Sequence, residues 1–167
     1  MPLVELSSLP DVSRAWVIGS ADPLTTNAEA ILIAQVDEYL AGWHAHGEPL
    51  TVGRDSREHR FLTIAVDPTA SDASGCSLDA LFRVFKGMEQ VLGTTLLDRA
   101  RVYFRDQTGV VQSTDRAGFS ELAERGVVTG ETPVFDTSVQ TLGEWRNRFE
   151  TPAAQAWQAA LLPKAER

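Results

Sequence analysis

Two stretches of the chain repeat apolar residues at steps of three or four, the spacing of amphipathic helices. The first follows Thr25 and Thr26, either of which can cap a helix, and Gly47 predicts its end. The second begins at Ser77, which has the chemistry of an N-cap, and ends at Gly93. The apolar stripes are Ile31, Leu32, Val36, Tyr39, Leu40 and Trp43 in the first helix, and Leu78, Leu81, Phe82, Phe85, Met88 and Leu92 in the second.

Strand-like runs lie before and between these helices. Residues 14–20 and 61–66 are rich in β-branched and apolar residues, and the near-continuous run 61–66 suits a central strand. Residues 102–111 predict a hairpin, and shorter helical patterns follow at 119–125, 141–150 and 153–161. The order predicts an α+β protein: a mostly antiparallel sheet with two long helices on one face, plus a small C-terminal α+β lobe.

The chain has 167 residues, of which 43% are hydrophobic, so it can bury a core of ordinary size. The predicted secondary structure changes near Asp98: long helices precede it, and a hairpin and short helices follow it. We therefore expect a core domain over residues 1–98. Residues 99–167 form the C-terminal lobe, either as a separate unit or as part of the same domain.

Charge and cysteine content limit the classes of partner. The formal net charge is -8, from 23 acidic and 15 basic residues, and such a surface repels nucleic acid. No apolar run approaches the ~20 residues of a membrane helix, so no membrane partner is expected. One cysteine forms no internal disulfide, and the N-terminus lacks the pattern of a signal peptide. We predict a cytoplasmic protein.

The loop Ser74–Asp79 is the most distinctive candidate site, because it holds the only cysteine and precedes the second helix. Unpaired amides at a helix start attract anions and stabilise a thiolate. Cys76 is therefore the candidate nucleophile, and Ser74, Gly75 and Ser77 are candidate ligand-binding residues. The expected ligand is a small molecule or a small anion, and the sequence leaves open whether a reaction is catalysed.

The basic stretch before the central strand could supply a base or an anion clamp opposite this loop. We expect His59 or Arg60 to face Cys76 and to complete the ligand site. The alternative is structural: Cys76 packs on Leu81 as a hydrophobic staple, and the histidines lie on the surface. One cysteine and three histidines without paired spacing indicate no metal site.

Motifs for nucleotide, dinucleotide, serine-hydrolase, zinc-protease and calcium sites are missing from the sequence. No cofactor is therefore expected.

Most of the chain, from about Trp16 to Trp157, resembles a family of small uncharacterised bacterial proteins whose members often carry the label "ABC transporter ATPase". The resemblance rests on Trp16-Val17, the 24–43 helix leading to His46-Gly47, Arg60-Phe61, Ala65-Val66-Asp67, the run from Ala73 to Asp79, and Asp98-Arg99. The chain has no phosphate loop to support that label. The resemblance implies no established activity and no catalytic residues.

The C-terminal third also resembles GYF-like domains, which bind proline-rich peptides. The likeness rests on the spacing of Leu122, Gly126, Thr132, Val134 and Phe135, while the Gly-Pro-Phe or Tyr core of those domains is absent. This likeness supports an alternative function, a non-enzymatic interaction module in the C-terminal lobe. Trp145 and Trp157 would then anchor a protein partner.

Overall fold

The computed structural model describes residues 3–69 and 71–164, and it is an α+β protein as predicted. The chain divides into two compact units. Unit 1 comprises Met1–Leu97 and Ser138–Asn147, and unit 2 comprises Asp98–Thr137 and Arg148–Arg167. The first division lies next to the predicted boundary at Asp98. Residues 138–147 nevertheless group with unit 1, whereas the sequence predicts a C-terminal lobe over all of 99–167.

Unit 1 is built on a four-stranded sheet. Its strands in spatial order are β1 (Leu3–Glu5), β5 (Thr51–Arg57), β6 (Phe61–Asp67) and β2 (Arg14–Gly19). Strand β6 pairs antiparallel with both β5 and β2, and only β1 is parallel to its neighbour. The six buried residues 61–66 belong to β6, one of the two inner strands of the sheet, as the apolar run predicted.

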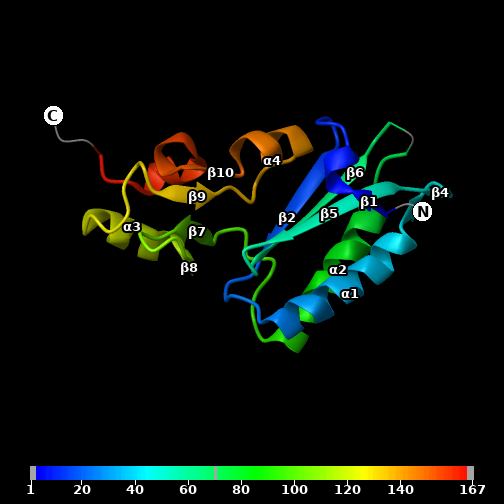
Figure 1. Cartoon of the computed structure of the whole chain (residues 1–167), viewed down its shortest axis with the longest axis horizontal. Helices are drawn as coiled ribbons and strands as arrows, with labels where there is room; N and C mark the ends of the chain where they lie inside the picture. The colour runs from blue at the N-terminus through cyan, green and yellow to red at the C-terminus, as the bar shows by residue number, and fades with distance from the viewer. Residues whose placement is uncertain (1–2, 70, 165–167) are drawn as a thin grey trace. The chain divides into compact units, whose positions relative to one another are not determined.

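Two long helices, α1 (Thr26–Ala41) and α2 (Gly75–Leu92), lie side by side on one face of this sheet (Figure 1). Thr25 caps α1 by accepting a hydrogen bond from the Ala28 amide. Gly93 ends α2 in the left-handed conformation that glycine adopts without strain. The apolar stripes of both helices meet the sheet in one core, which includes Leu32, Val36, Leu40, Leu62, Ile64, Val66, Leu81, Phe85 and Met88.

The first helix is shorter than the sequence predicted. It ends at Ala41 instead of continuing to Gly47, and β3 (His44–Ala45) and β4 (Glu48–Pro49) then form a small hairpin. His46 and Gly47 form its turn, both at positive φ. Trp43 is still buried, because it packs beside Tyr39 and Trp16 after the helix has ended.

The opposite face of the sheet is covered by short elements. The 3-10 helix η1 (Leu6–Ser8) passes so close to Gly53 that a Cβ there would lie 3.0 Å from the Leu6 Cα. Helix α4 (Leu142–Arg148) is joined to the N-terminal segment because Arg146 donates hydrogen bonds to Asp11 and to the Leu9 carbonyl.

Unit 2 has its own four-stranded antiparallel sheet, which contains the predicted 102–111 hairpin. Its strands in order are β10 (Glu150–Pro152), β9 (Pro133–Phe135), β7 (Val102–Arg105) and β8 (Val111–Thr114). Helix α3 (Arg116–Glu124) packs on it around Phe104 and Phe119. The predicted last helix forms two 3-10 helices, η2 (Ala153–Gln155) and η3 (Trp157–Leu161).

Asp106 organises the turn of this hairpin. Its carboxylate accepts hydrogen bonds from the hydroxyl and amide of Thr108, from Gln112 and from the Val110 amide. These bonds, that of the Thr108 hydroxyl foremost, lower the pKa of Asp106 to about 2.

Candidate functional site

The Cys76 loop forms the start of α2, but the helix begins earlier than predicted. Ser74, not Ser77, is the N-cap: its hydroxyl accepts from the Ser77 amide at 3.2 Å. The Ser77 hydroxyl donates to the Ser74 carbonyl at 2.9 Å, and the Ser77 carbonyl accepts from Tyr39 at 2.6 Å. Both serine hydroxyls therefore serve the helix start itself.

Gly75 is the first residue of α2 and Cys76 is the second, and both are exposed. The exposed thiol does not fit a buried hydrophobic staple, whereas Leu81 is fully buried. Cys76 thus lies on the surface at the helix start, close to Ser74 and Ser77 in the same turn.

His59 and Arg60 do not face this loop, so that part of the predicted site is wrong. They precede β6, and the Cys76 loop follows it. A seven-residue strand spans roughly 20 Å, so the residues before it and after it lie at opposite ends of the strands. The sequence alone did not show that the basic stretch forms the turn between β5 and β6. This hairpin places His59 and Arg60 at the end of β6 that is far from Cys76.

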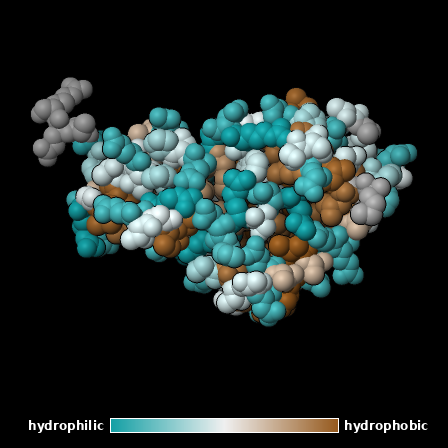
Figure 2. All heavy atoms as spheres, viewed as in Figure 1, coloured by the Kyte–Doolittle hydropathy of each residue, from teal (hydrophilic) through white to brown (hydrophobic). Residues whose placement is uncertain are grey.

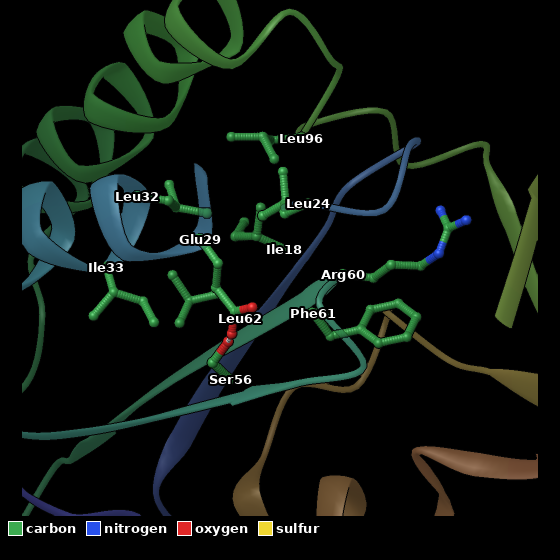
Figure 3. A pocket seen from close by; sticks show the side chains of 10 residues that line it. All are labelled: Ile18, Leu24, Glu29, Leu32, Ile33, Ser56, Arg60, Phe61, Leu62 and Leu96. Atoms are coloured by element: carbon green, nitrogen blue, oxygen red, sulfur yellow. Dashed lines mark hydrogen bonds between the residues drawn. The ribbon is translucent and has the colours of Figure 1, made fainter. Parts of the chain in front are cut away.

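A recess opens in unit 1 at the His59 end of the sheet, between α1, the start of β6 and the segment after α2 (Figure 3). It is small and open to solvent: its cavity volume is about 10 Å³, room for about one water molecule. The lining is mostly apolar, with three polar residues: Ile18, Leu24, Leu32, Ile33, Phe61, Leu62 and Leu96, with Glu29, Ser56 and Arg60.

Glu29 is the centre of a hydrogen-bonded cluster at this recess. The Ser56 hydroxyl donates to one carboxylate oxygen at 2.7 Å, and His59 Nδ1 lies 2.5 Å from the other. Glu29 and Ser56 point toward one another in Figure 3. A carboxylate only accepts, so His59 Nδ1 is the donor in this hydrogen bond.

Burial raises the pKa of Glu29, but hydrogen bonds from Ser56 and His59 and the charge of His59 outweigh it. The net pKa lies below the ordinary value of 4.5. The Glu29 side chain is 19% exposed and that of His59 is 63% exposed, so a nearly buried carboxylate holds an accessible imidazole.

The backbone that carries His59 has an unusual conformation. The Arg60 amide donates to the Arg57 carbonyl across a β-turn, and the two central residues, Glu58 and His59, have φ of 61° and 52°. This is the type I′ geometry, in which Asn and Gly are the favoured residues. The Leu24 amide donates to the His59 carbonyl at 2.8 Å and fixes the turn against the start of α1.

Arg60 is buried, and its guanidinium turns away from Glu29 and Ser56 in Figure 3. It donates to the Ser20 and Ala21 carbonyls at 3.1 and 2.7 Å. Arg60 therefore anchors the chain after β2, and its aliphatic stem lines the recess.

Sequence reasoning missed Glu29 and Ser56. In the sequence, Glu29 is one acidic residue near the start of a predicted helix, and Ser56 lies in the charged run before the central strand. The available signal was the alternation of polar residues along β5, which places Arg54 and Ser56 on the helix side of the sheet.

The two tryptophans of the interaction hypothesis both pack within the chain. Trp145 is buried under the guanidinium of Arg57, and Trp157 packs on the core of unit 2 under Arg116. On the face drawn in Figure 2, apolar atoms lie in separate groups among hydrophilic ones. Packing within the chain therefore accounts for the positions of both indole rings.

Within residues 3–69 and 71–164, no cluster of three or more His, Cys, Asp and Glu side chains is arranged to hold a metal ion. No helix in this described part is long and apolar enough to cross a bilayer. No protein-family model, curated protein or solved structure matches the chain. The family resemblance of its sequence therefore stays a prediction.

Proposed function

We propose that this protein binds a small molecule in the recess of unit 1, beside the Glu29–His59 pair. The observation that carries this proposal is the combination of an apolar hollow with an oriented, accessible imidazole at its edge. Ligand sites in proteins have this composition: mostly apolar walls with a few convergent polar groups.

The size and charge of the recess limit the ligand. The cavity volume is about 10 Å³, room for about one water molecule, whereas ligand pockets run from about 300 to 1,000 Å³, so a ligand would lie mostly at the open mouth of the recess. The ionised Glu29 in the wall disfavours an anion, and the apolar lining favours a hydrocarbon body. The proposed ligand is a neutral molecule of few heavy atoms with one polar group directed to His59. This replaces the small anion expected at the Cys76 loop.

Fragment binding followed by NMR of methyl groups tests the proposal. Small neutral aromatic and aliphatic fragments should shift the methyl signals of Leu24, Leu62 and Leu96 in the full chain. Ile33→Trp places a large ring in the lining and should abolish these shifts. Ile31→Trp is the matched control, because Ile31 is an exposed apolar residue on the same helix and does not line the recess.

Equal shifts in both tryptophan variants, or shifts confined to methyl groups elsewhere, would show that the fragments bind outside the recess. The proposed function would then be wrong.

A further inference from the structure

We infer that His59 is a pH-sensitive latch between the β5–β6 turn and α1: the charged imidazolium holds the turn against Glu29, and the neutral ring lets the turn open. An open turn widens the recess beside it, so the latch regulates the entry of a ligand. The latch itself needs no ligand, whereas its control of ligand entry rests on the proposed function.

Two hydrogen bonds of His59 fasten the turn to α1 and to the segment before that helix. Its Nδ1 lies 2.5 Å from one carboxylate oxygen of Glu29, and its carbonyl accepts from the Leu24 amide at 2.8 Å. Ser56 donates to the other carboxylate oxygen, so the carboxylate stays directed at the ring. His59 is therefore a point at which the turn is joined to the helix layer.

The bond to Glu29 depends on pH. Histidine is the side chain whose charge changes between about pH 5 and 8, and the ring of His59 is 63% exposed, so water reaches it. Glu29 stays ionised in this range, because its pKa lies below the ordinary value of 4.5. A carboxylate binds an imidazolium more strongly than a neutral ring. The latch is therefore fastened near pH 5.5 and weakened as the pH rises toward 8.

The turn is strained, and this strain favours opening once the bond weakens. Glu58 and His59 have φ of 61° and 52°, in the left-handed region that costs energy for residues with side chains. Such a conformation persists only while the surrounding contacts hold it. A contact that depends on one ionisable ring thus shifts the population of the open turn.

The latch joins the two walls of the recess. Leu24 and Glu29 line it from the side of α1, and Ser56 and Phe61 line it from the side of the hairpin. With the turn fastened, the cavity volume is about 10 Å³, room for about one water molecule. Separation of the turn from Leu24 and Glu29 moves these walls apart, and a ligand can then enter beyond the mouth.

The other charged groups near His59 leave Glu29 as its partner. Besides Glu29, the charged residues on the turn and on the elements packed against it are Asp22, Asp37, Glu38, Arg54, Asp55, Arg57, Glu58 and Arg60. Four of these residues form two ion pairs with each other, and Arg60 donates to backbone carbonyls. Glu58, the neighbour of His59 in the turn, adds a negative charge that also favours the charged ring.

Amide hydrogen exchange of the full chain at pH 5.5 and 7.5 tests the latch. After correction for the intrinsic exchange rate at each pH, protection of the Leu24 amide should fall about two- to fivefold at the higher pH. This is the range for a partly exposed ion pair. The Ala21 amide, which donates to the Thr95 carbonyl at 3.0 Å, is the internal control and should keep its protection.

Three variants assign the change to the latch. His59→Asn keeps the turn, because asparagine tolerates a positive φ, but it removes the ionisable ring. Glu29→Gln removes the negative partner. Both should abolish the pH dependence at Leu24, whereas the matched control His44→Asn should retain it: His44 is exposed, and its Nδ1 lies 2.5 Å from a neutral carbonyl, that of Gly42. A pH dependence that persists in His59→Asn overturns the latch.

Fragment binding separates the latch from the site that it regulates. At one fragment concentration, the methyl shifts of Leu24 and Leu62 should be larger at pH 7.5 than at pH 5.5, and Glu29→Gln should remove this difference. Equal shifts of the wild type at both pH values would overturn the control of ligand entry. No shifts at either pH, with Leu24 exchange still dependent on pH, would reject the proposed function and leave the latch supported.

Discussion

The guanidinium of Arg57, on β5, lies over the indole ring of Trp145, on α4, with its Cζ 4.4 Å from the ring centroid. Neighbouring side chains of a strand point to opposite faces. Ser56 therefore meets the recess on the helix side, while Arg57 meets α4 on the other side. One strand end thus couples the candidate site to the packing of residues 138–147 within unit 1.

Arg57→Ala should lower the free energy of unfolding by about 0.5–1 kcal/mol, the range of an exposed cation–π contact. The Asp55 carboxylate, 2.8 Å from Arg57 Nε, would lose its partner as well. Urea unfolding followed by tryptophan fluorescence measures the change. Arg83→Ala, at an exposed arginine of α2, is the control and should have a smaller effect. Equal effects would mean that the stacking on Trp145 contributes nothing.

Replacing Glu58 should stabilise the turn. Glu58→Asn puts a residue that tolerates the left-handed region at φ 61°, and we expect a gain of about 0.5–1 kcal/mol in unfolding free energy. The turn of the β3–β4 hairpin, which also has two residues at positive φ, supplies a control substitution with the opposite expected effect on stability. Gly47→Ala adds a Cβ at φ 79° and should destabilise by about 1 kcal/mol. Chemical denaturation of both variants checks the pair, and a destabilised Glu58→Asn would contradict the strain argument.

The helices show what an apolar period can and cannot reveal. The stripe from Ile31 to Trp43 correctly marks Leu32, Val36, Leu40 and Trp43 as buried. It misplaces the end of α1, because the His46-Gly47 turn forms a hairpin and Trp43 is buried from non-helical backbone. At α2, the sequence predicted the N-cap at Ser77, and the hydrogen bond that makes Ser74 the cap depends on backbone geometry.

The candidate site was beyond sequence reasoning for a different reason. Glu29 and His59 are thirty residues apart and belong to no motif, so their contact follows from tertiary structure alone. The contact requires a positive φ at His59, which its sequence neighbours do not favour. The Cys76 loop attracted attention because it is distinctive in composition, and the strand β6 separates it from the residues expected to complete it.

Glu29 should make the free energy of unfolding depend on pH in the acid range. Its pKa is lowered in the folded state, so the charged carboxylate stabilises the fold at and above its ordinary pKa of 4.5. This contribution is lost as the pH falls through the lower folded value. Glu29→Gln should therefore be less stable than the wild type at pH 7, with the difference shrinking below pH 4. Urea unfolding across this range tests it, with the exposed Glu38→Gln on the same helix as control. A difference that does not change with pH would show that lost packing, not charge, is responsible.

The exposed position of Cys76 predicts an accessible thiol that takes no part in the recess. In the native chain it should react with a maleimide at least about a third as fast as in the unfolded chain, because an exposed sulfur needs no opening of the fold to react. Mass spectrometry of the labelled chain over time gives both rates. Cys76→Ser should leave fragment binding unchanged, because β6 separates residue 76 from the end of the sheet where the recess lies. If Cys76→Ser abolishes the fragment shifts while Ile33→Trp leaves them in place, the fragments bind at the start of α2, and the Cys76 loop expected from the sequence is the functional site.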